Sequence, residues 1–584
     1  MALLTRTRGP LPRPLPGALA AFAALSGLAA CAKQAPVPLR PEPVAWADTL
    51  PIPEPEYREP LEAPLLIHDA VSGQVAKGVS VRRLAGRSHE ALNVTRMDDV
   101  VSSAWFEHRN DARRLTPEET YRGPTTDAGP DTTGPILLTQ AKLQGISPGF
   151  HIEDVRGVRY VVKFDPKGFQ YLSSAAGVIS NRLLYAAGYH VPEDYIFRFR
   201  RDQITGVKEG ATYQDAEFVE HPLEEGLVDE ILSRVDTLPD GRFLAVASRY
   251  VAGPPLGPFH FSGTRPDDPN DWYAHEHRRD LRGLYVVSAW VNHVDMRFAN
   301  TMDAFVDPGY VRHYLIDFAA TLGSGTIRPH YPREGEEYNF DLWPTTARVF
   351  TLGFYRQGWE DQPHTVIDPS IGWMQVESFD PAGWKANWPN QAFVNMTARD
   401  AYWGAKLVGS FTDEQIRAAV DAGQLPGAFA ADTLAAMLRY RRDRIVEHWY
   451  GEVSPVERPE VIPAPGAGPG FGLAFEDFGI RDGAWNAEGT SYRWRLRHEA
   501  LGRRWEGTVG ATEGSAQELA IRPTGAGAGE RGARASMPAP DGADGTLATL
   551  EVEITRDGAG GRAATVYLQW DGPAERYRVV GLEH

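Results

Sequence analysis

The stretch Asn292–Asp303, NHVDMRFANTMD, decides how the rest of the chain is interpreted. It follows a segment, residues 275–293, whose apolar residues recur at helical spacing. Within the stretch, Asp295 and Asn300 place a carboxylate and an amide five positions apart, just after the expected helix ends. Carboxylate and amide oxygens are ligands that Mg²⁺ accepts, and a carboxylate can also take a proton from a hydroxyl group. The stretch therefore predicts a loop that holds a metal ion and orients a substrate.

Two further motifs complete the set that transfer of a phosphoryl group needs: a base near the acceptor hydroxyl, oxygen ligands for Mg²⁺, and cations on the phosphates. Downstream, the apolar run VRHYLIDF carries Asp317 next to its last residue. Upstream, the strand-like run YVVKF carries Lys163, whose ammonium group needs an anionic partner if it is buried. In these roles Lys163 contacts phosphates, Asp295 serves the acceptor hydroxyl, and Asn300 and Asp317 hold the metal ion.

A glycine-containing turn, GISPGF, lies between the strand-like runs ILLTQAKLQG and FHIEDVRG. A flexible turn at such a place can cover the phosphates of a nucleotide. Gly145, Ser147 and Gly149 of this turn, together with Lys163, are therefore the predicted nucleotide-binding residues.

The H-x-D-x-x-x-x-N motif at His293–Asn300, the D-F-x at Asp317 and the strand lysine Lys163 resemble those of the protein-kinase-like superfamily, in the broad sense that includes aminoglycoside, toxin-type and secreted kinases. The resemblance covers about residues 95–450. It implies an α+β fold with a β-rich N-lobe and a helical C-lobe, and it implies Mg²⁺ and ATP as cofactors. The segments GYHVPEDY and RHYLIDF further resemble a group of bacterial lipoproteins of this type.

Two positions depart from the pattern of active kinases. Such enzymes hold the strand lysine with a glutamate on the following helix. Here the expected helix, residues 173–188, has no acidic residue and carries Gly177 where the glutamate is expected. The one carboxylate nearby, Asp165, flanks the lysine, and Ala319 stands in place of the D-F-G glycine. The metal and base positions are thus intact, while the partner of the lysine is missing.

The first residues predict export from the cytoplasm. MALLTRTRGPLPRPLPGALAAFAALSGLAAC carries three arginines and no acidic residue, and its apolar run is too short to span a bilayer. Its last four residues, Leu28–Cys31, resemble a bacterial lipobox, and Cys31 is the only cysteine of the chain. The resemblance implies a signal peptide over residues 1–30, a lipid on Cys31 and an anchor in the cell envelope, with Ala32 favouring the outer membrane. An ordinary signal peptide with a chance cysteine is the alternative.

The motifs leave several functions open. The first is an envelope-anchored phosphotransferase whose acceptor is a protein, a sugar or a lipid head group, with nucleotidyl transfer as a variant. The second is a binding or scaffold lipoprotein with a degenerate kinase fold, which Gly177 and the ATP-poor compartment both favour. A third is a site that binds a divalent metal ion and a phosphate compound without catalysis.

Changes in composition and stretches rich in proline and glycine divide the chain into segments. A net charge of −17 over 584 residues makes nucleic acid an unfavourable partner. The expected segments are a signal peptide (1–30), a proline-rich tether (31–60), an extension that packs on the N-lobe (61–135), the N-lobe (136–253), the C-lobe (254–455), a linker (456–470) and a small β-sandwich-like domain (471–584). In the last segment Tyr492, Trp494 and Leu496 alternate with arginines, as in an antiparallel strand with one buried face.

Four features receive structural interpretations. His275 and His277 lie two apart on an expected helix, so their side chains diverge rather than share a metal ion. His293 is expected to brace its loop. The run RRDR at residues 441–444 is expected to form a solvated helix face, and Asp303 is expected to be a turn carboxylate rather than a further metal ligand.

Overall fold

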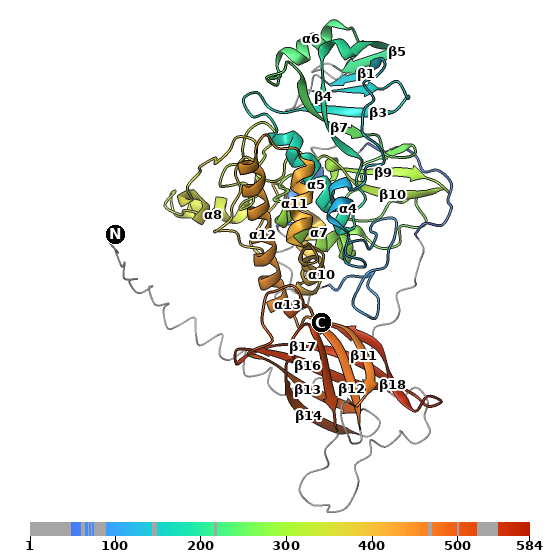
Figure 1. Cartoon of the computed structure of the whole chain (residues 1–584), viewed down its shortest axis with the longest axis vertical. Helices are drawn as coiled ribbons and strands as arrows, with labels where there is room; N and C mark the ends of the chain where they lie inside the picture. The colour runs from blue at the N-terminus through green and yellow to red at the C-terminus, as the bar shows by residue number, and fades with distance from the viewer. Residues whose placement is uncertain are drawn as a thin grey trace, which may run out of the picture. The chain divides into compact units, whose positions relative to one another are not determined.

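The computed structural model describes residues 48–59, 65–67, 69–71, 73–74, 89–142, 149–214, 219–464, 470–498, 502–522 and 547–584. Over these residues the fold is α+β, with helices and four β-sheets (Figure 1). The predicted signal peptide, Cys31, Gly145 and Ser147 lie outside the described residues. In the described part of the chain, no helix is long and apolar enough to cross a membrane.

A seven-stranded sheet forms the first large element. Its strand order is β4-β7-β3-β2-β1-β5-β6, and every neighbouring pair is antiparallel except β1 with β5. The bounds are β1 (Ile136–Lys142), β2 (Gly149–Glu153), β3 (Arg159–Phe164), β4 (Asp194–Phe199), η1 (Arg201–Gln203), β5 (Ile204–Gln214), β6 (Glu220–Pro222), α6 (Gly226–Ser233) and β7 (Phe243–Arg249). The strand-like runs predicted from the sequence correspond to β1, β2, β3 and β7.

The two faces of this sheet are covered differently. One face packs with α6 into an apolar core that includes Phe150, Tyr160, Val162, Phe197 and Ile231. Side chains alternate along a strand, so the intervening residues point to the other face. Helix α5 (Leu172–Ala187) covers part of that second face, where Val178 packs with Val246 and Ile196. The uncovered part of the second face is available for a site.

Helix α5 is fixed at both ends. At its start, Oδ1 of Asp165 accepts hydrogen bonds from the backbone N–H groups of Ser173 and Ser174, each 2.8 Å long. At its end, Gly188 has a φ of 118°, in the region that favours glycine, and acts as the predicted C-cap. The carboxylate of Asp165 therefore caps the N-terminus of α5. This agrees with the expectation that Asp165 is not the partner of Lys163.

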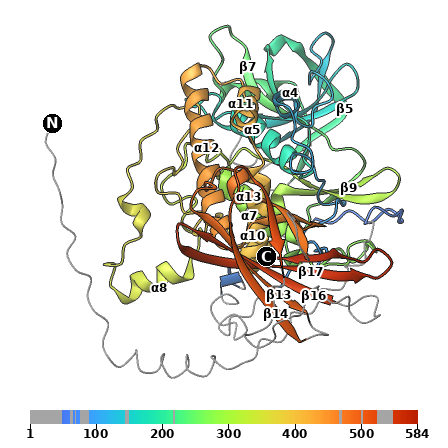
Figure 2. The ribbon, with the colours of Figure 1, turned by 60° about the horizontal axis from the view of Figure 1, so that its bottom comes forward.

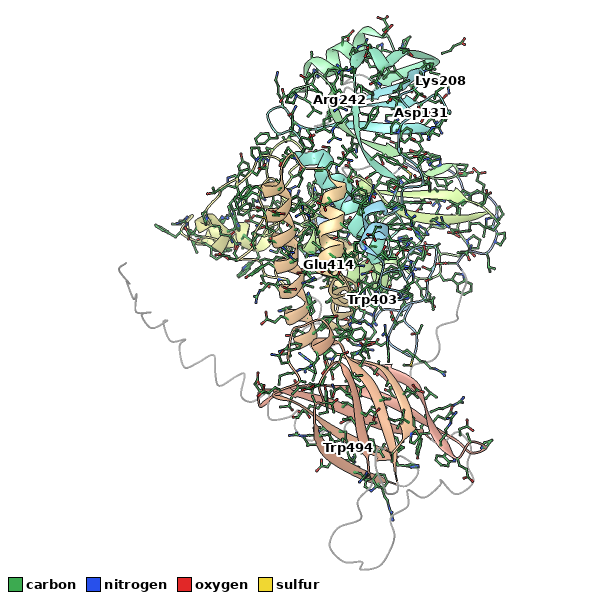
Figure 3. The ribbon with its side chains drawn as sticks, in the orientation of Figure 1. Asp131, Lys208, Arg242, Trp403, Glu414 and Trp494 are labelled. Atoms are coloured by element: carbon green, nitrogen blue, oxygen red, sulfur yellow. The ribbon has the colours of Figure 1, made fainter. Side chains whose placement is uncertain are left out.

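Four of the longer helices lie between residues 279 and 451. Helices α7 (Arg279–Trp290), α10 (Ala398–Gly409), α11 (Asp413–Ala422) and α12 (Ala428–Gly451) pack side by side (Figures 1 and 2). Thr412 caps α11 through the predicted capping box with Gln415. Trp403 of α10, labelled in Figure 3, is buried in the large core that these helices share with α5. The shorter elements are α4 (Pro117–Arg122), β8 (Pro255–Gly257), η2 (His275–His277), η3 (Phe298–Asn300), β9 (Thr301–Val306), β10 (Tyr310–Leu315), α8 (Leu342–Phe350), η4 (Gly358–Asp361) and α9 (Gln391–Asn395).

The predicted N-terminal extension packs on the N-lobe near its end, where Asp127 pairs with Arg156 (2.8 Å) and the N–H of Asp131 donates to Asp154 (3.1 Å), and it also packs on the helical part. Trp105 stacks on His313 of β10 with ring centroids 3.5 Å apart, and Phe106 packs edge-on against Trp403. Both aromatic residues belong to the core of the helical part and α5, and not to the core of the seven-stranded sheet. Trp105 thus packs against β10 and Phe106 against α10, while residues 127–131 pack against the seven-stranded sheet.

The last part of the predicted tether is bound to the fold. The backbone N–H of Ile52 donates to the carbonyl of Gly309 (2.8 Å), and that of Arg58 donates to the carbonyl of Leu256 (3.1 Å). Residues 48–59 thus run along the sheet formed by β8, β9 and β10, and the prediction of a free tether as far as residue 60 is wrong for them. Residues 31–47 lie outside the described part.

The C-terminal residues form two sheets around one core. The first sheet has the order β11-β12-β15, and the second has the order β14-β13-β16-β17-β18. The bounds are β11 (Val456–Pro463), β12 (Phe471–Asp477), α13 (Phe478–Arg481), β13 (Thr490–His498), β14 (Arg503–Gly510), β15 (Ala516–Ile521), β16 (Leu547–Arg556), β17 (Ala559–Asp571) and β18 (Arg576–Glu583). Trp494, labelled in Figure 3, is buried with Leu473 of the other sheet, as expected for a sandwich. The predicted linker is wrong at residues 456–463, because these residues form the edge strand β11.

Candidate functional site

A cavity of about 540 Å³ lies against the second face of the seven-stranded sheet. The sheet contributes Val161, Lys163, Asp194, Val246 and Ser248, which alternate with residues of the apolar core. The facing wall is made by Met302 of β9 and by the residues after β10, namely Ile316, Asp317, Phe318 and Ala319. This volume and the mixture of apolar walls with a few charged groups are typical of a small-molecule site.

The predicted lysine and the predicted metal ligand meet in this cavity. Nζ of Lys163 lies 2.8 Å from Oδ2 of Asp317, and their side chains remain 37% and 34% exposed, so a ligand can reach both. Burial alone would raise the pKa of Asp317, but the charge and hydrogen bond of Lys163 outweigh it and hold that pKa below its usual value. Asp317 has a φ of 62°, a strained conformation of the kind that concentrates at functional sites.

The loop between α7 and β9 carries the other two predicted residues. Nδ2 of Asn300 donates to the backbone carbonyl of Asp295 (2.7 Å) and to its Oδ2 (3.0 Å). Arg297 forms an ion pair with Oδ1 of Asp295 at 3.0 Å. The carbonyl of Asn300 accepts a hydrogen bond from the N–H of Ile316 (3.0 Å), which joins this loop to the segment that carries Asp317. Asp295, Asn300 and Asp317 are thus held in one connected unit.

The carboxyl group of Asp295 is tuned toward proton acceptance. Burial raises its pKa, the charge of Arg297 and the hydrogen bond from Asn300 lower it, and the negative charge of Asp317 raises it, with a net rise. A carboxylate with a raised pKa is a better general base than an ordinary surface aspartate. The site therefore has a candidate base close to the candidate metal ligands.

His293 has the structural environment that the sequence suggested. Its ring is fully buried and lies edge-on to Phe318, with centroids 5.8 Å apart. Burial lowers the pKa of His293 to about 4, so the ring is neutral near pH 7. A neutral ring packed on the residue after Asp317 connects the loop to the facing wall of the cavity.

The nucleotide-binding prediction is described only in part. Gly149 opposes Lys163 in the pairing of β2 with β3. Gly145 and Ser147 lie outside the described residues. Gly177 of α5 lines the cavity, and a Cβ atom added there would have no atom within 4 Å. The helix therefore leaves room for a Cβ atom at this position beside the cavity.

Sequence reasoning missed Asp194, which is the second acidic residue of the cavity wall. It is 4% exposed, it begins β4, and its Oδ1 is buried without a hydrogen-bond partner among the described residues. Burial raises the pKa of Asp194 to about 6, although a hydrogen bond from Ser248 and the charges of Arg182 and Lys163 lower it. The only sequence signal was an acidic residue at the start of an apolar strand-like run, DYIFRF.

Two carboxylate and histidine predictions can be compared with the structure. Asp303 is not a turn residue: it lies on β9, buried between Arg265 (3.1 Å) and His313 (2.6 Å). His275 is buried and paired with Asp271 at 2.7 Å, a structural contact. In the part of the chain that is described, no group of three or more His, Cys, Asp or Glu side chains is arranged to hold a metal ion.

The prediction that residues 441–444 form a solvated face is wrong at Arg441. This guanidinium group is fully buried and donates hydrogen bonds to the carbonyls of Ala289, Trp290 and Gln375. Two of these carbonyls belong to the last turn of α7, just before the loop that carries Asp295. Burial lowers the pKa of Arg441 to about 9. Its guanidinium group caps the C-terminal end of α7 by donating hydrogen bonds to the last carbonyls of that helix.

Comparison with known proteins adds no relative: no family model, no curated protein and no solved structure matches the chain. Within the described residues, the cavity holds a cation, Lys163, and an ionised carboxylate, Asp317, while Asn300 and the candidate base Asp295 lie on the adjoining loop and are not among the residues that line the cavity.

Proposed function

We propose that the chain is a kinase-like phosphotransferase that uses a Mg²⁺-bound nucleotide and is anchored in the bacterial envelope through Cys31. The observation that carries the proposal is the meeting of Lys163 and Asp317 at 2.8 Å inside a cavity large enough for a small molecule. The acceptor is a protein or a small molecule, and nucleic acid is disfavoured by the net charge of −17.

The arrangement of elements supports a two-lobed kinase-like domain. Protein kinases carry the phosphate-binding lysine on the third strand of the N-lobe and the metal ligands on the catalytic loop and the D-F-G segment. In this chain Lys163 lies on β3, Asn300 lies on the loop after α7, and Asp317 follows β10. The seven-stranded sheet precedes the helical part in the chain, as the resemblance implies.

The residues present fit a Mg²⁺-bound nucleotide. With Nδ2 of Asn300 held by Asp295, the amide oxygen of Asn300 is the atom left to bind a metal ion, and Asp317 is kept ionised by Lys163. Magnesium sites of this kind use one or two protein ligands together with phosphate oxygens. The apolar side chains of Val161, Val246 and Met302 offer surfaces on which the nucleobase of the nucleotide can pack.

Each residue then has a defined part in the reaction. Lys163 binds a phosphate oxygen, while Asn300 and Asp317 hold Mg²⁺, which when bound neutralises charge on the phosphates. Asp295 orients the acceptor hydroxyl and takes its proton as that oxygen forms a bond to the terminal phosphorus. The bond from this phosphorus to the leaving nucleoside diphosphate breaks in the same step.

A second candidate is a binding lipoprotein that has lost catalysis. The observation that favours it is the empty space at Gly177, where active kinases place the partner of the lysine. The two candidates differ in turnover and not in fold.

The experiment is binding of Mg²⁺-ATP to the protein lacking residues 1–31, followed by release of phosphate. The phosphotransferase proposal expects Mg²⁺-dependent binding that is lost in Asp317→Asn, and slow hydrolysis of ATP that is lost in Asp295→Asn. Binding without any hydrolysis or transfer would favour the second candidate. Mass spectrometry of the full-length protein from bacterial membranes, with Cys31→Ser as the control, tests the lipid anchor.

A further inference from the structure

In the proposed site, Lys163 pairs with the same carboxylate, Asp317, that would bind the metal ion, and no second anionic partner for the lysine has been identified. The inference about that partner rests on the proposed function. Asp317 is the one carboxylate within salt-bridge distance of Lys163 among the described residues. If Asp317 takes a metal ion, its negative charge is shared between that ion and Lys163, whose ammonium group must still point at the phosphates. A lysine in a cavity of this kind needs a second anion to hold its direction.

Helix α5 does not provide that anion. It carries no acidic residue, and its cavity-lining positions are Ser173 and Gly177. Asp165 is engaged at the N-terminus of the helix by Ser173 and Ser174. The partner must therefore come from another element of the wall.

Asp194 has the position for this role. Across the sheet, Lys163 pairs with Val246 and Val246 pairs with Ile196, while Asp194 pairs with Ser248 one row further along. Because residues two apart on a strand share a face, Asp194 and Lys163 point to the same side of the sheet. Of the described residues that line the cavity, only Asp194 and Asp317 are acidic.

Asp194 also has unused hydrogen-bonding capacity. Its Oδ1 is buried and has no partner among the described residues, although buried carboxylate oxygens are almost always satisfied. The charges of Lys163 and Asp317 both act on this carboxyl group, which indicates that the three groups share one electrostatic environment. Within the described part of the chain, Oδ1 of Asp194 is thus an unpaired buried acceptor on the same face of the sheet as Lys163, two strands away.

We infer that Asp194 is the positioning residue that holds Lys163 when Asp317 binds the metal ion, in place of the helix glutamate that Gly177 replaces. The partner of the lysine has moved from α5 to the first residue of β4. The site is then complete rather than degenerate, and the open space at Gly177 is a consequence of the exchange.

The test compares affinities for Mg²⁺-ATP in Asp194→Asn, in the double variant Gly177→Glu/Asp194→Asn, and in Glu193→Gln as a matched control one residue away. Loss of a buried charge partner should weaken binding in Asp194→Asn by about tenfold or more. Glu193 lines a different cavity and pairs with Arg249 (3.1 Å) rather than with Lys163, so Glu193→Gln should stay within about twofold of the wild type. A glutamate at Gly177 enters open space and should restore most of the lost affinity. An affinity of Asp194→Asn equal to the wild type, or a loss that Gly177→Glu does not recover, would overturn the inference.

A second readout needs no nucleotide and separates this inference from the proposed function. In the presence of EDTA, the rate at which an amine-reactive ester labels Lys163 is measured by mass spectrometry in Asp317→Asn and in Asp317→Asn/Asp194→Asn. The inference expects labelling to be at least about threefold faster in the double variant, because Lys163 then has neither carboxylate. Equal rates would overturn the inference even if the wild type binds Mg²⁺-ATP. Faster labelling in a protein whose wild type binds no nucleotide would reject the proposed function and keep the Lys163–Asp194 pair.

Discussion

Lys163 of β3 and Asp317, which follows β10, form an ion pair of 2.8 Å across the cavity. The pair joins the seven-stranded sheet to the segment that is tied to the 292–300 loop through the hydrogen bond from Ile316 to Asn300. Only Oδ2 of Asp317 contacts the lysine in this pair, so under the proposed function a metal ion would share or compete for this carboxylate.

The first prediction concerns Asp295 as the base. Asp295→Asn keeps the hydrogen bond from Asn300 to the residue 295 carbonyl but removes the proton acceptor. Turnover should fall by roughly 10²- to 10⁴-fold, while affinity for Mg²⁺-ATP changes little. Phosphate release and calorimetric binding measure the two effects separately. Asp432→Asn on the exposed face of α12 is the control, and unchanged turnover in Asp295→Asn would rule out the assigned role.

The second prediction concerns Arg441. Arg441→Met leaves the carbonyls of Ala289, Trp290 and Gln375 without their donor, and unfolding free energy should fall by roughly 2–4 kcal/mol. Arg444→Met, on the exposed side of the same helix, should change it by less than about 0.5 kcal/mol. Urea denaturation of both variants makes the comparison. Equal effects would mean that the hydrogen bonds of Arg441 contribute nothing specific.

The sequence predicted those parts of the fold that depend on local patterns. Gly188 ends α5 and Thr412 begins α11 because caps are set by one or two residues. Tyr492 and Trp494 are buried because strand side chains alternate. Such features need no knowledge of distant contacts, and they were the ones predicted correctly.

The features that the sequence did not predict depend on distant partners. Asp194 resembles any acidic residue before a strand until its pairing with Ser248 places it on the cavity face of the sheet that also carries Lys163. The charged run around Arg441 suggested that this residue is exposed to solvent. Arg441 instead falls on the buried stripe formed by Leu434, Leu438 and Ile445. Helical periodicity, rather than local charge, was the signal that could have identified it.

The third prediction concerns the pH dependence of stability at Asp194. Its pKa in the folded protein is about 6, above the ordinary value of 3.8, so between these values the folded chain keeps a proton that the unfolded chain has lost. The stability of the wild type relative to Asp194→Asn is therefore greatest near pH 4 and falls as the pH rises through about 6. At pH 7.5 Asp194→Asn should be the more stable protein, with its advantage over the wild type about 1–3 kcal/mol larger than at pH 4.5.

Urea denaturation at the two pH values measures this difference, with Glu193→Gln as the control for a change of charge in the same segment. A more stable variant that binds nucleotide more weakly is the combination expected of a residue kept for function. Destabilisation by Asp194→Asn at pH 7.5 would instead indicate a purely structural carboxylate.

The most direct test of the central claim is the thermal unfolding of the protein lacking residues 1–31, with and without Mg²⁺ and ATP. Binding at a hundred times the dissociation constant should add about 2.7 kcal/mol to the unfolding free energy. The account predicts a rise in Tm that requires Mg²⁺ and that disappears in Asp317→Asn, while Asp432→Asn keeps it. No rise with any nucleotide, or a rise that Asp317→Asn retains in full, would contradict the assignment of the Lys163–Asp317 cavity as a Mg²⁺-nucleotide site.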